Sequence, residues 1–230
     1  MRSELLIIIP AYNEQENIEN VVNFIKTKYS QYDYIVVNDG SKDKTAEICR
    51  QKGYELLDLP VNLGLAGAFQ AGLKYAYEKR YSYAIQFDAD GQHRPEFIES
   101  MLTRMKEGYD IVIGSRFVRE RKDKSMRMFG SRMLTVIIKM TTGIRIADPT
   151  SGMRMFSESM IEEFAQNMNY GPEPDTISYL LKNGAKVSEV QVKMEERQFG
   201  ESYLNLINSA KYMTNMLISI LLVQNFRKRF

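Results

Sequence analysis

The sequence predicts an α/β fold in which an open, mostly parallel sheet carries helices on both faces. Through the first half of the chain, short apolar runs alternate with segments whose apolar residues recur at helical spacing. The first run, Leu5–Pro10, is apolar throughout, which is typical of a strand buried on both faces. The composition of the 230 residues, 44% apolar and 26% charged, supports one sizeable core. Strands and helices that alternate in this way favour parallel strands joined by crossover helices.

The elements follow a regular order up to about residue 115. We expect short apolar strands, each closed by a polar or glycine-containing turn, at Leu5–Pro10, Tyr34–Asn38, Tyr54–Leu59, Tyr83–Phe87 and Asp110–Ile113. The helices between them are expected at 18–25, Thr45–Lys52, Leu65–Lys79 and 95–106. Pro95 suits the first turn of the last of these helices.

The second half of the chain is less regular. Helical patterns cover Met126–Met140 and a segment that ends near Lys182, and Lys186–Val192 alternates like a strand. The charge run Arg119–Lys124 predicts a solvated loop, and Asp148–Gly152 predicts a turn. We therefore divide the chain into an α/β domain, residues 1–200, and a C-terminal helical segment, residues 201–230.

Composition excludes several classes of protein. The single cysteine, Cys49, excludes an intramolecular disulfide framework, and the single histidine, His93, argues against a histidine-built metal cluster. The formal net charge of +2 is too small to indicate a charged partner, and we expect no binding to nucleic acid. The first apolar run ends at Pro10 and is too short for a signal peptide. No apolar run reaches the roughly 18 residues of a membrane span, so we expect a cytoplasmic protein.

Polar clusters follow four of the predicted strands at their carboxyl ends. These clusters are Tyr12–Glu14, Asn38–Gly40, Asp88–Asp90 and Gly114–Arg116. Because ligands of open α/β sheets bind beyond the carboxyl ends of the strands, four separate segments deliver polar residues to one binding edge.

Asp88 and Asp90 could together address a hard cation, Mg²⁺ or Mn²⁺, that bridges a diphosphate. We expect Asp90 to bind the metal with Gln92, and Asp88 to lean toward the nucleotide. Asp39 could accept hydrogen bonds from a base or a ribose, or could bond its own turn. Gly64, at the entrance of a helix, could admit a nucleotide closely or could simply pack the helix on the sheet.

These motifs resemble family 2 glycosyltransferases with the GT-A fold. The resemblance rests on Ile9–Glu14, Asn38–Thr45, Asn62–Gly64 and Asp88–Gln92, in the family's order and spacing. It implies transfer of a sugar from a nucleoside diphosphate with inversion at the anomeric carbon. It also implies that Pro10, Tyr12, Glu14 and Asp39 frame the base and ribose, and that Asp88, Asp90 and Gln92 serve the diphosphate and metal. Asn38 departs from the family, in which many members have aspartate.

A closer resemblance is to the polyprenyl-phosphate sugar transferases, the dolichol-phosphate mannose synthase type. It rests on Asp90–His93, Gly114–Arg116 and Asp148–Arg154. In that group two arginines and a serine hold the acceptor phosphate, which implies this role for Arg116, Arg127 and Ser131. Arg197–Ser202 resembles a mobile loop that closes over the diphosphate, which implies a role for Arg197. A lipid phosphate is already an anion, so it needs positive charge to place it and no general base.

The C-terminal segment has an amphipathic helical pattern. A polar stripe contains Asn208, Tyr212, Asn215 and Ser219, and a wide apolar face lies beside it. The chain ends with the basic run Arg227–Arg229, which suits a membrane interface with anionic lipid. Met126–Met140 could be a second interfacial helix. We expect a peripheral protein at the inner face of the cell membrane, and a small membrane protein or a second copy of the chain as a further partner. Packing on the domain is the alternative for the C-terminal helix.

The first functional hypothesis is therefore an inverting transferase that moves a sugar from a nucleoside diphosphate to undecaprenyl phosphate for cell-surface polysaccharide. UDP is the first choice of nucleotide, and GDP stays open as the alternative. A second is transfer to a glycan hydroxyl, which needs a general base such as Glu173 or Asp175. A third is a nucleotide-sugar sensor without turnover, against which both Asp88 and Asp90 argue. A nucleotidyltransferase is disfavoured because Tyr12–Glu14 stands where that chemistry usually has a glycine-rich basic loop.

Overall fold

The structure, a computed structural model, describes residues 3–123, 125–167, 171, 173–195 and 206–226. Its strands are β1 (Leu5–Ala11), β2 (Asp33–Asn38), β3 (Leu56–Asp58), β4 (Tyr83–Gln86), β5 (Ile111–Ser115), β6 (Arg154–Ser157) and β7 (Val187–Gln191). Its α-helices are α1 (Ile18–Lys28), α2 (Thr45–Gln51), α3 (Gly64–Glu78), α4 (Ile98–Lys106), α5 (Met126–Thr142), α6 (Glu158–Gln166), α7 (Pro174–Lys182) and α8 (Leu206–Leu221). Short 3₁₀ turns cover Pro95–Phe97 and Val223–Phe226.

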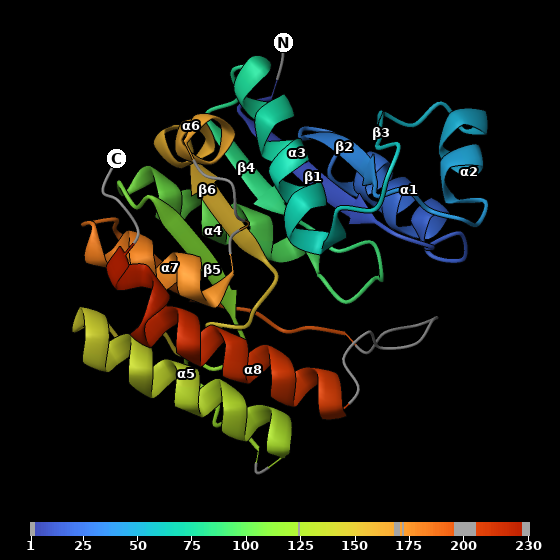
Figure 1. Cartoon of the computed structure of the whole chain (residues 1–230). Coiled ribbons are helices and arrows are strands. Elements are labelled where there is room, and N and C mark those ends of the chain that lie inside the picture. Colours follow the sequence, from blue (N-terminus) through green and yellow to red (C-terminus); the bar gives the residue numbers. More distant parts are fainter. Residues whose placement is uncertain (1–2, 124, 168–170, 172, 196–205, 227–230) are drawn as a thin grey trace.

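The strands form a seven-stranded sheet in the order β3-β2-β1-β4-β6-β5-β7 (Figure 1). All the pairings are parallel except those of β6, which runs antiparallel to both β4 and β5. The predicted α/β fold with a mostly parallel sheet is therefore confirmed. β6 and α6 have no counterpart among the predicted elements, because the residues after the turn at Asp148–Gly152 lack a regular apolar pattern.

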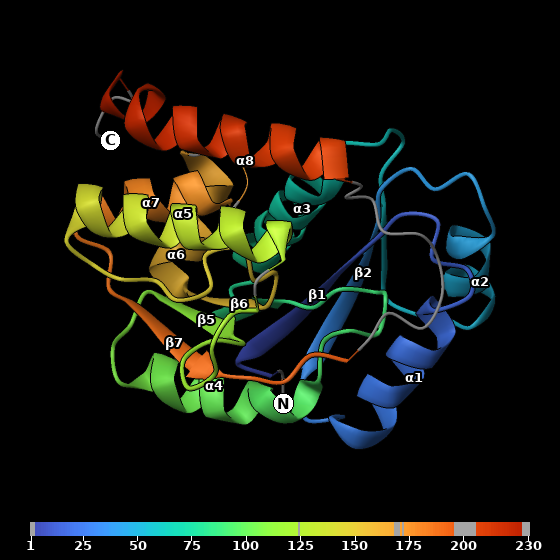
Figure 2. The ribbon, with the colours of Figure 1, turned by 90° about the horizontal axis from the view of Figure 1, so that it is seen from below.

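Helices cover both faces of the sheet, and alternate residues of β1 divide between the two cores. Leu6 and Ile8 pack with α3, α5, α6 and α7, whereas Leu5, Ile7 and Ile9 pack with α1, α2 and α4. This division follows from the strand period of two, and it explains why the whole of β1 is apolar. Figure 2 shows the two helical layers on opposite sides of the sheet.

The C-terminal helix α8 lies against α5 and α7 on the outside of one helical layer (Figures 1 and 2). Two members of its polar stripe face the domain: the Tyr212 hydroxyl donates to Glu173, and the Ser219 hydroxyl donates to Asp175. Gly130 of α5 brings the two helices close, since a Cβ there would lie 2.9 Å from Cγ of Met213. No helix within the described residues combines the length and apolarity needed to cross a bilayer.

Replacing Ile220 of α8 by alanine should lower the free energy of unfolding by about 2–3 kcal/mol, because the side chain is fully buried and its removal leaves a cavity. Urea or thermal unfolding checks this value. Ile218→Ala is the matched control on the same helix, since Ile218 is 48% exposed and its truncation should cost less than about 0.5 kcal/mol. Equal effects of the two variants would mean that α8 does not pack as described.

Candidate active site

The carboxyl ends of β1, β2, β4 and β5 lie at one edge of the sheet, as their common direction requires. β1 runs parallel to β2 and β4, and β5 has the same direction because β6 is antiparallel to both β4 and β5. The predicted clusters after these strands therefore converge. Pro10 lies buried near the end of β1, paired with Val37 of β2.

The loop after β1 is tied to the loop after β2. The Asn13 amide donates to Oγ of Ser41 at 3.0 Å, and the Lys42 amide donates to Oδ1 of Asn13 at 2.9 Å. Glu14 is fixed in the same way, by its amide donating to Oγ1 of Thr45. Asn13 has φ of +56°, a conformation in which asparagine is enriched. Tyr12 is thereby left 38% exposed, with its ring accessible to a planar base.

Asp39 is buried and fixes the entrance of α3. Its Oδ1 accepts from the Leu63 amide at 2.7 Å, and its backbone carbonyl accepts from the Asn62 side chain at 3.1 Å. Gly40 packs so closely on this segment that a Cβ would lie 2.8 Å from the Asn62 nitrogen. Gly64 begins α3 with φ of +76° and open space where a Cβ would be. Asp39 thus bonds a remote segment rather than its own turn.

Asn38 has a local reason to be an amide. Its Nδ2 donates to Oδ1 of Asp58 at 2.6 Å, and Asp58 also pairs with Arg50. An aspartate at position 38 would place a second carboxylate against Asp58, which like-charge repulsion disfavours.

Asp88 lies two residues beyond the end of β4, and its carboxylate is close to His93 and Gly152. Its backbone amide donates to Nδ1 of His93 at 2.8 Å, and its Oδ2 lies 3.4 Å from Nε2 of the same ring. Because Nδ1 accepts a hydrogen bond, the proton of the neutral ring is on Nε2. Gly152 covers this carboxylate, since a Cβ there would lie 2.9 Å from Oδ2 of Asp88. His93, whose role sequence reasoning did not find, therefore positions Asp88.

Asp90 has different neighbours because β4 ends at Gln86 and the chain turns before Gly91, whose φ is +77°. Oδ1 of Asp90 accepts from the Gln92 amide at 3.0 Å. Gln92 is held in turn by backbone hydrogen bonding with Glu195. Oxygen donors from two carboxylates and one amide suit Mg²⁺ or Mn²⁺, which commonly take their remaining ligands from phosphate oxygens and water. The described residues hold no cluster of three or more His, Cys, Asp or Glu side chains suited to a metal ion.

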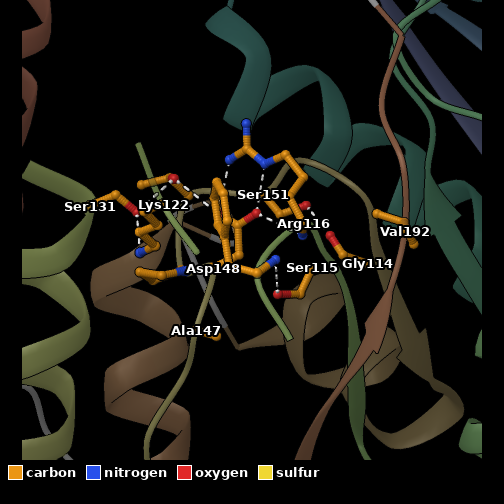
Figure 3. A network of polar contacts seen from close by, with 12 residues as sticks. Gly114, Ser115, Arg116, Lys122, Ser131, Ala147, Asp148, Ser151 and Val192 are labelled. Atoms are coloured by element: carbon orange, nitrogen blue, oxygen red, sulfur yellow. Dashed lines mark hydrogen bonds and ion pairs between the residues drawn. The ribbon is translucent and has the colours of Figure 1, made fainter. Parts of the chain in front are cut away.

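Arg116 forms a two-pronged ion pair with Asp148 (Figure 3). Its Nε and Nη2 donate to Oδ2 and Oδ1 of Asp148 at 2.7 and 2.9 Å, and its backbone amide also donates to Oδ2. The Asp148 side chain is fully buried, while the Arg116 side chain is 21% exposed. Glu189 of β7 accepts hydrogen bonds from the backbone amides of Ala147 and Asp148. Arg116 is therefore anchored by the Asp148 carboxylate, whose own backbone is fixed by Glu189.

The loop Asp148–Gly152 connects this pair to Asp88. Asp148, at one end, holds Arg116, and Gly152, at the other, lies against the Asp88 carboxylate. The loop is fastened between them, because the Ser151 hydroxyl donates to the Gly114 carbonyl and Nη2 of Arg154 donates to the Pro149 carbonyl. Burial lowers the pKa of Arg154, and Glu173 opposes that shift most strongly. Arg154 is a further site component that the sequence analysis did not single out.

Ser131 lies in α5 with its side chain buried, and the ammonium of Lys122 donates to its hydroxyl at 2.7 Å (Figure 3). The predicted solvated loop at Arg119–Lys124 is thus only partly correct, since Lys122 is half-buried. Of the other predicted residues, the Arg127 side chain and Arg197 lie outside the described part of the structure.

The two candidates for a general base lie beneath α8. Oδ2 of Asp175 accepts from the Ser219 hydroxyl and Oδ1 from the Thr176 amide, and Asp175 is 6% exposed. Glu173 accepts from the Tyr212 hydroxyl. This contact and burial raise the pKa of Tyr212, with burial as the larger cause. The carboxylates of both residues therefore serve the packing of α7 against α8.

Comparison with known proteins agrees with this geometry. The family model "Glycosyl transferase family 2" matches residues 6–164. The chain is 28% identical over 221 residues to the polyprenol monophosphomannose synthase of Mycolicibacterium smegmatis, covering 90% of this chain and 83% of that one. It is 30% identical over 213 residues to the UDP-N-acetylglucosamine–dolichyl-phosphate N-acetylglucosaminyltransferase of Methanococcus voltae, covering 82% and 84%.

A solved structure shares the fold. Glucosyl-3-phosphoglycerate synthase from Mycobacterium tuberculosis, crystallised with Mn²⁺, UDP and phosphoglyceric acid, superposes with a TM-score of 0.68 at 18% identity, over 99% of this chain and 80% of that one. The match of the family model covers most of the chain and includes the clusters at the ends of β1, β2, β4 and β5. The chain belongs to glycosyl transferase family 2.

Proposed function

We propose that this protein is an inverting transferase that moves a sugar from a UDP-linked donor to a polyprenyl phosphate such as undecaprenyl phosphate, for cell-surface polysaccharide synthesis. The observation that carries the proposal is the loop Asp148–Gly152, which joins Arg116 at one end to Asp88 at the other. A positively charged group that could bind an anionic acceptor thus lies near the carboxylates that would hold the metal and the nucleotide diphosphate. The two relatives differ in the sugar that their names give, but both names include a polyprenyl-type lipid.

The chemistry requires few protein groups. An oxygen of the acceptor phosphate attacks the anomeric carbon, and the bond from that carbon to the diphosphate breaks with its electron pair leaving on the diphosphate. Because the phosphate is already anionic, no proton has to be removed. Asp90 and Gln92 would hold Mg²⁺ or Mn²⁺, which when bound neutralises charge on the leaving diphosphate. Tyr12, Glu14 and Asp39 would frame the base and ribose, with Gly64 admitting the nucleotide closely and Pro10 supporting the loop.

The proposal is tested by incubating the protein and Mn²⁺ or Mg²⁺ with a panel of UDP- and GDP-sugars and undecaprenyl phosphate, scored for glycolipid by mass spectrometry. We expect glycolipid from a UDP-sugar. Transfer should survive Asp175→Asn, since that carboxylate serves α8, and should collapse with Arg127→Ala. Transfer to a glycan hydroxyl alone would contradict the proposed lipid-phosphate acceptor. Binding of nucleotide-sugar without any turnover would contradict the proposal that the protein is an enzyme.

We further propose that α5 places the protein on the inner face of the cell membrane. Its outer side carries an apolar stripe at spacings of three and four residues: Phe129, Met133, Val136 and Met140, which are 37–80% exposed. Arg132 and Lys139 are exposed on the same helix. Apolar side chains flanked by basic ones suit an anionic lipid surface. Exposed apolar side chains of the adjacent α8, Ile218 and Leu221, and Leu222 just beyond that helix, add to the apolar surface.

Replacing Val136 and Met140 together by aspartate should reduce binding to phosphatidylglycerol vesicles by about tenfold or more, because two inserted apolar groups are lost and two like charges are gained. Vesicle co-sedimentation measures the effect. Phe24→Asp is the control, since Phe24 is 46% exposed on α1, across the sheet. A loss of binding with Phe24→Asp but not with the double variant would assign the membrane surface to the other face.

A further inference from the structure

Two cations share one aromatic ring beside the predicted acceptor serine. The guanidinium carbon of Arg116 lies 5.1 Å from the centroid of the Phe117 ring, and the ammonium of Lys122 lies 5.4 Å from the same centroid. Both groups are therefore held in place by the same side chain, which contributes a modest cation–π attraction to each. Figure 3 shows Lys122 beside Ser131, with Arg116 in the same polar network.

Hydroxyl groups, not carboxylates, surround the Lys122 ammonium. Nζ donates to Oγ of Ser131 at 2.7 Å and to Oγ1 of Thr135 at 3.2 Å. Oγ of Ser131 in turn lies 3.4 Å from Oγ1 of Thr150. Within the described residues no carboxylate forms an ion pair with Lys122, and the nearby Asp148 is already paired with Arg116. The cluster thus has more positive than negative charge at close range.

The electrostatic environment of the Lys122 ammonium agrees with this charge balance. The pKa of Lys122 is lowered to about 8, chiefly by burial and in part by the positive charges of Arg116 and Arg132. Asp148 and Glu189 act in the opposite direction but do not restore the usual value. A half-buried cation of this kind is stabilised by any anion that binds beside it.

We propose that Lys122 is a phosphate-binding residue of the acceptor site, where its ammonium and the hydroxyl of Ser131 meet the acceptor phosphate together with Arg116. The hydrogen-bond directions support this assignment: Lys122 donates to the Ser131 oxygen, so the Ser131 hydroxyl proton can turn from Oγ1 of Thr150, 3.4 Å away, to an anion. An exposed phosphate dianion would supply the charge that the cluster lacks, through short charge-assisted hydrogen bonds. This inference rests on the proposed lipid-phosphate acceptor. It adds a phosphate-binding residue, Lys122, that the charge run at Arg119–Lys124 does not distinguish from its neighbours.

The test compares Lys122→Gln, Lys122→Arg and the wild type in steady-state transfer to farnesyl phosphate, a short polyprenyl phosphate. We expect Lys122→Gln to raise the acceptor KM by about 10- to 100-fold, the factor that one charge-assisted hydrogen bond carries, with the donor KM changed less than about twofold. Lys122→Arg should retain most of the acceptor affinity. Lys74→Gln, the same change at an exposed position of α3, should leave both constants unaltered.

The pH profile gives a second readout that a merely structural role would not change. Lys122 is protonated below its pKa of about 8 in the free protein, and the lipid phosphate is a dianion across this range. The wild-type acceptor KM should therefore rise as the pH increases above about 8, and this rise should be absent with Lys122→Arg. An unchanged acceptor KM with a folded Lys122→Gln protein overturns the inference alone. Donor consumption without transfer to lipid phosphate by the wild type overturns the proposed function as well.

Discussion

Replacing Asp90 by alanine should lower the rate of sugar transfer by about 10²- to 10³-fold without unfolding the protein. The proposed role of Asp90, with Gln92, is to hold the cation that neutralises the diphosphate. Such a cation supplies several kcal/mol to the transition state, and each 1.36 kcal/mol corresponds to a factor of ten in rate. The fold should tolerate the change because Asp90 is only partly buried, in a turn beyond the end of β4.

The measurement is the initial rate as a function of Mn²⁺ or Mg²⁺ concentration, together with calorimetric binding of UDP with and without metal. Asp90→Ala should remove most of the metal-dependent part of UDP binding, which separates a metal ligand from a residue that acts on the acceptor. Glu107→Ala is the control, since this exposed carboxylate pairs with Arg104 at the end of α4. A wild-type metal dependence in Asp90→Ala would show that the cation is held elsewhere.

The order of the elements could be predicted because most strands and helices have a local signal. β1 is apolar at every position, and the period of α1 appears directly in Ile18, Val21, Val22 and Ile25, all of which are buried. The rule that ligands bind at the carboxyl ends of strands then brought Asp39 and Asp88 to one edge without coordinates. These predictions depend on short stretches of sequence, which is why they succeeded.

Features that depend on distant partners could not be predicted in this way. β6 has only four residues and begins with Arg154. This buried arginine donates a hydrogen bond to the Pro149 carbonyl, a partner that the local sequence pattern does not indicate. Lys122 is one of several charges in a run, and only the fold brings it to Ser131 and Phe117. The stripe on α8 was read as a polar face, yet Ser219 contacts a buried carboxylate of α7. Helical periodicity cannot distinguish water from a polar partner.

Replacing Asp148 by asparagine should lower the free energy of unfolding by about 3 kcal/mol and weaken the acceptor site at the same time. The carboxylate is fully buried and accepts from Nε, Nη2 and the backbone amide of Arg116, with Thr150 as a further donor. An asparagine of nearly the same volume keeps the packing but presents an amide N–H₂ to one prong of the guanidinium. Breaking a buried ion pair from one side leaves the partner charge uncompensated, which is strongly destabilising.

For a chain of this size, a loss of about 3 kcal/mol corresponds to a fall in Tm of about 6–12 °C, which calorimetry resolves readily. Glu19→Gln is the matched control, because Glu19 pairs with Lys52 at 2.6 Å while both side chains are more than 40% exposed, and such pairs contribute about 0–1 kcal/mol.

The Asp148→Asn protein that remains folded should also show a raised acceptor KM, since Arg116 loses its anchor. A lower Tm with an unchanged acceptor KM would mean that the pair stabilises the fold without shaping the site. Because the same loop carries Gly152 against Asp88, a simultaneous rise in the donor KM would show that the two halves of the site are positioned as one unit.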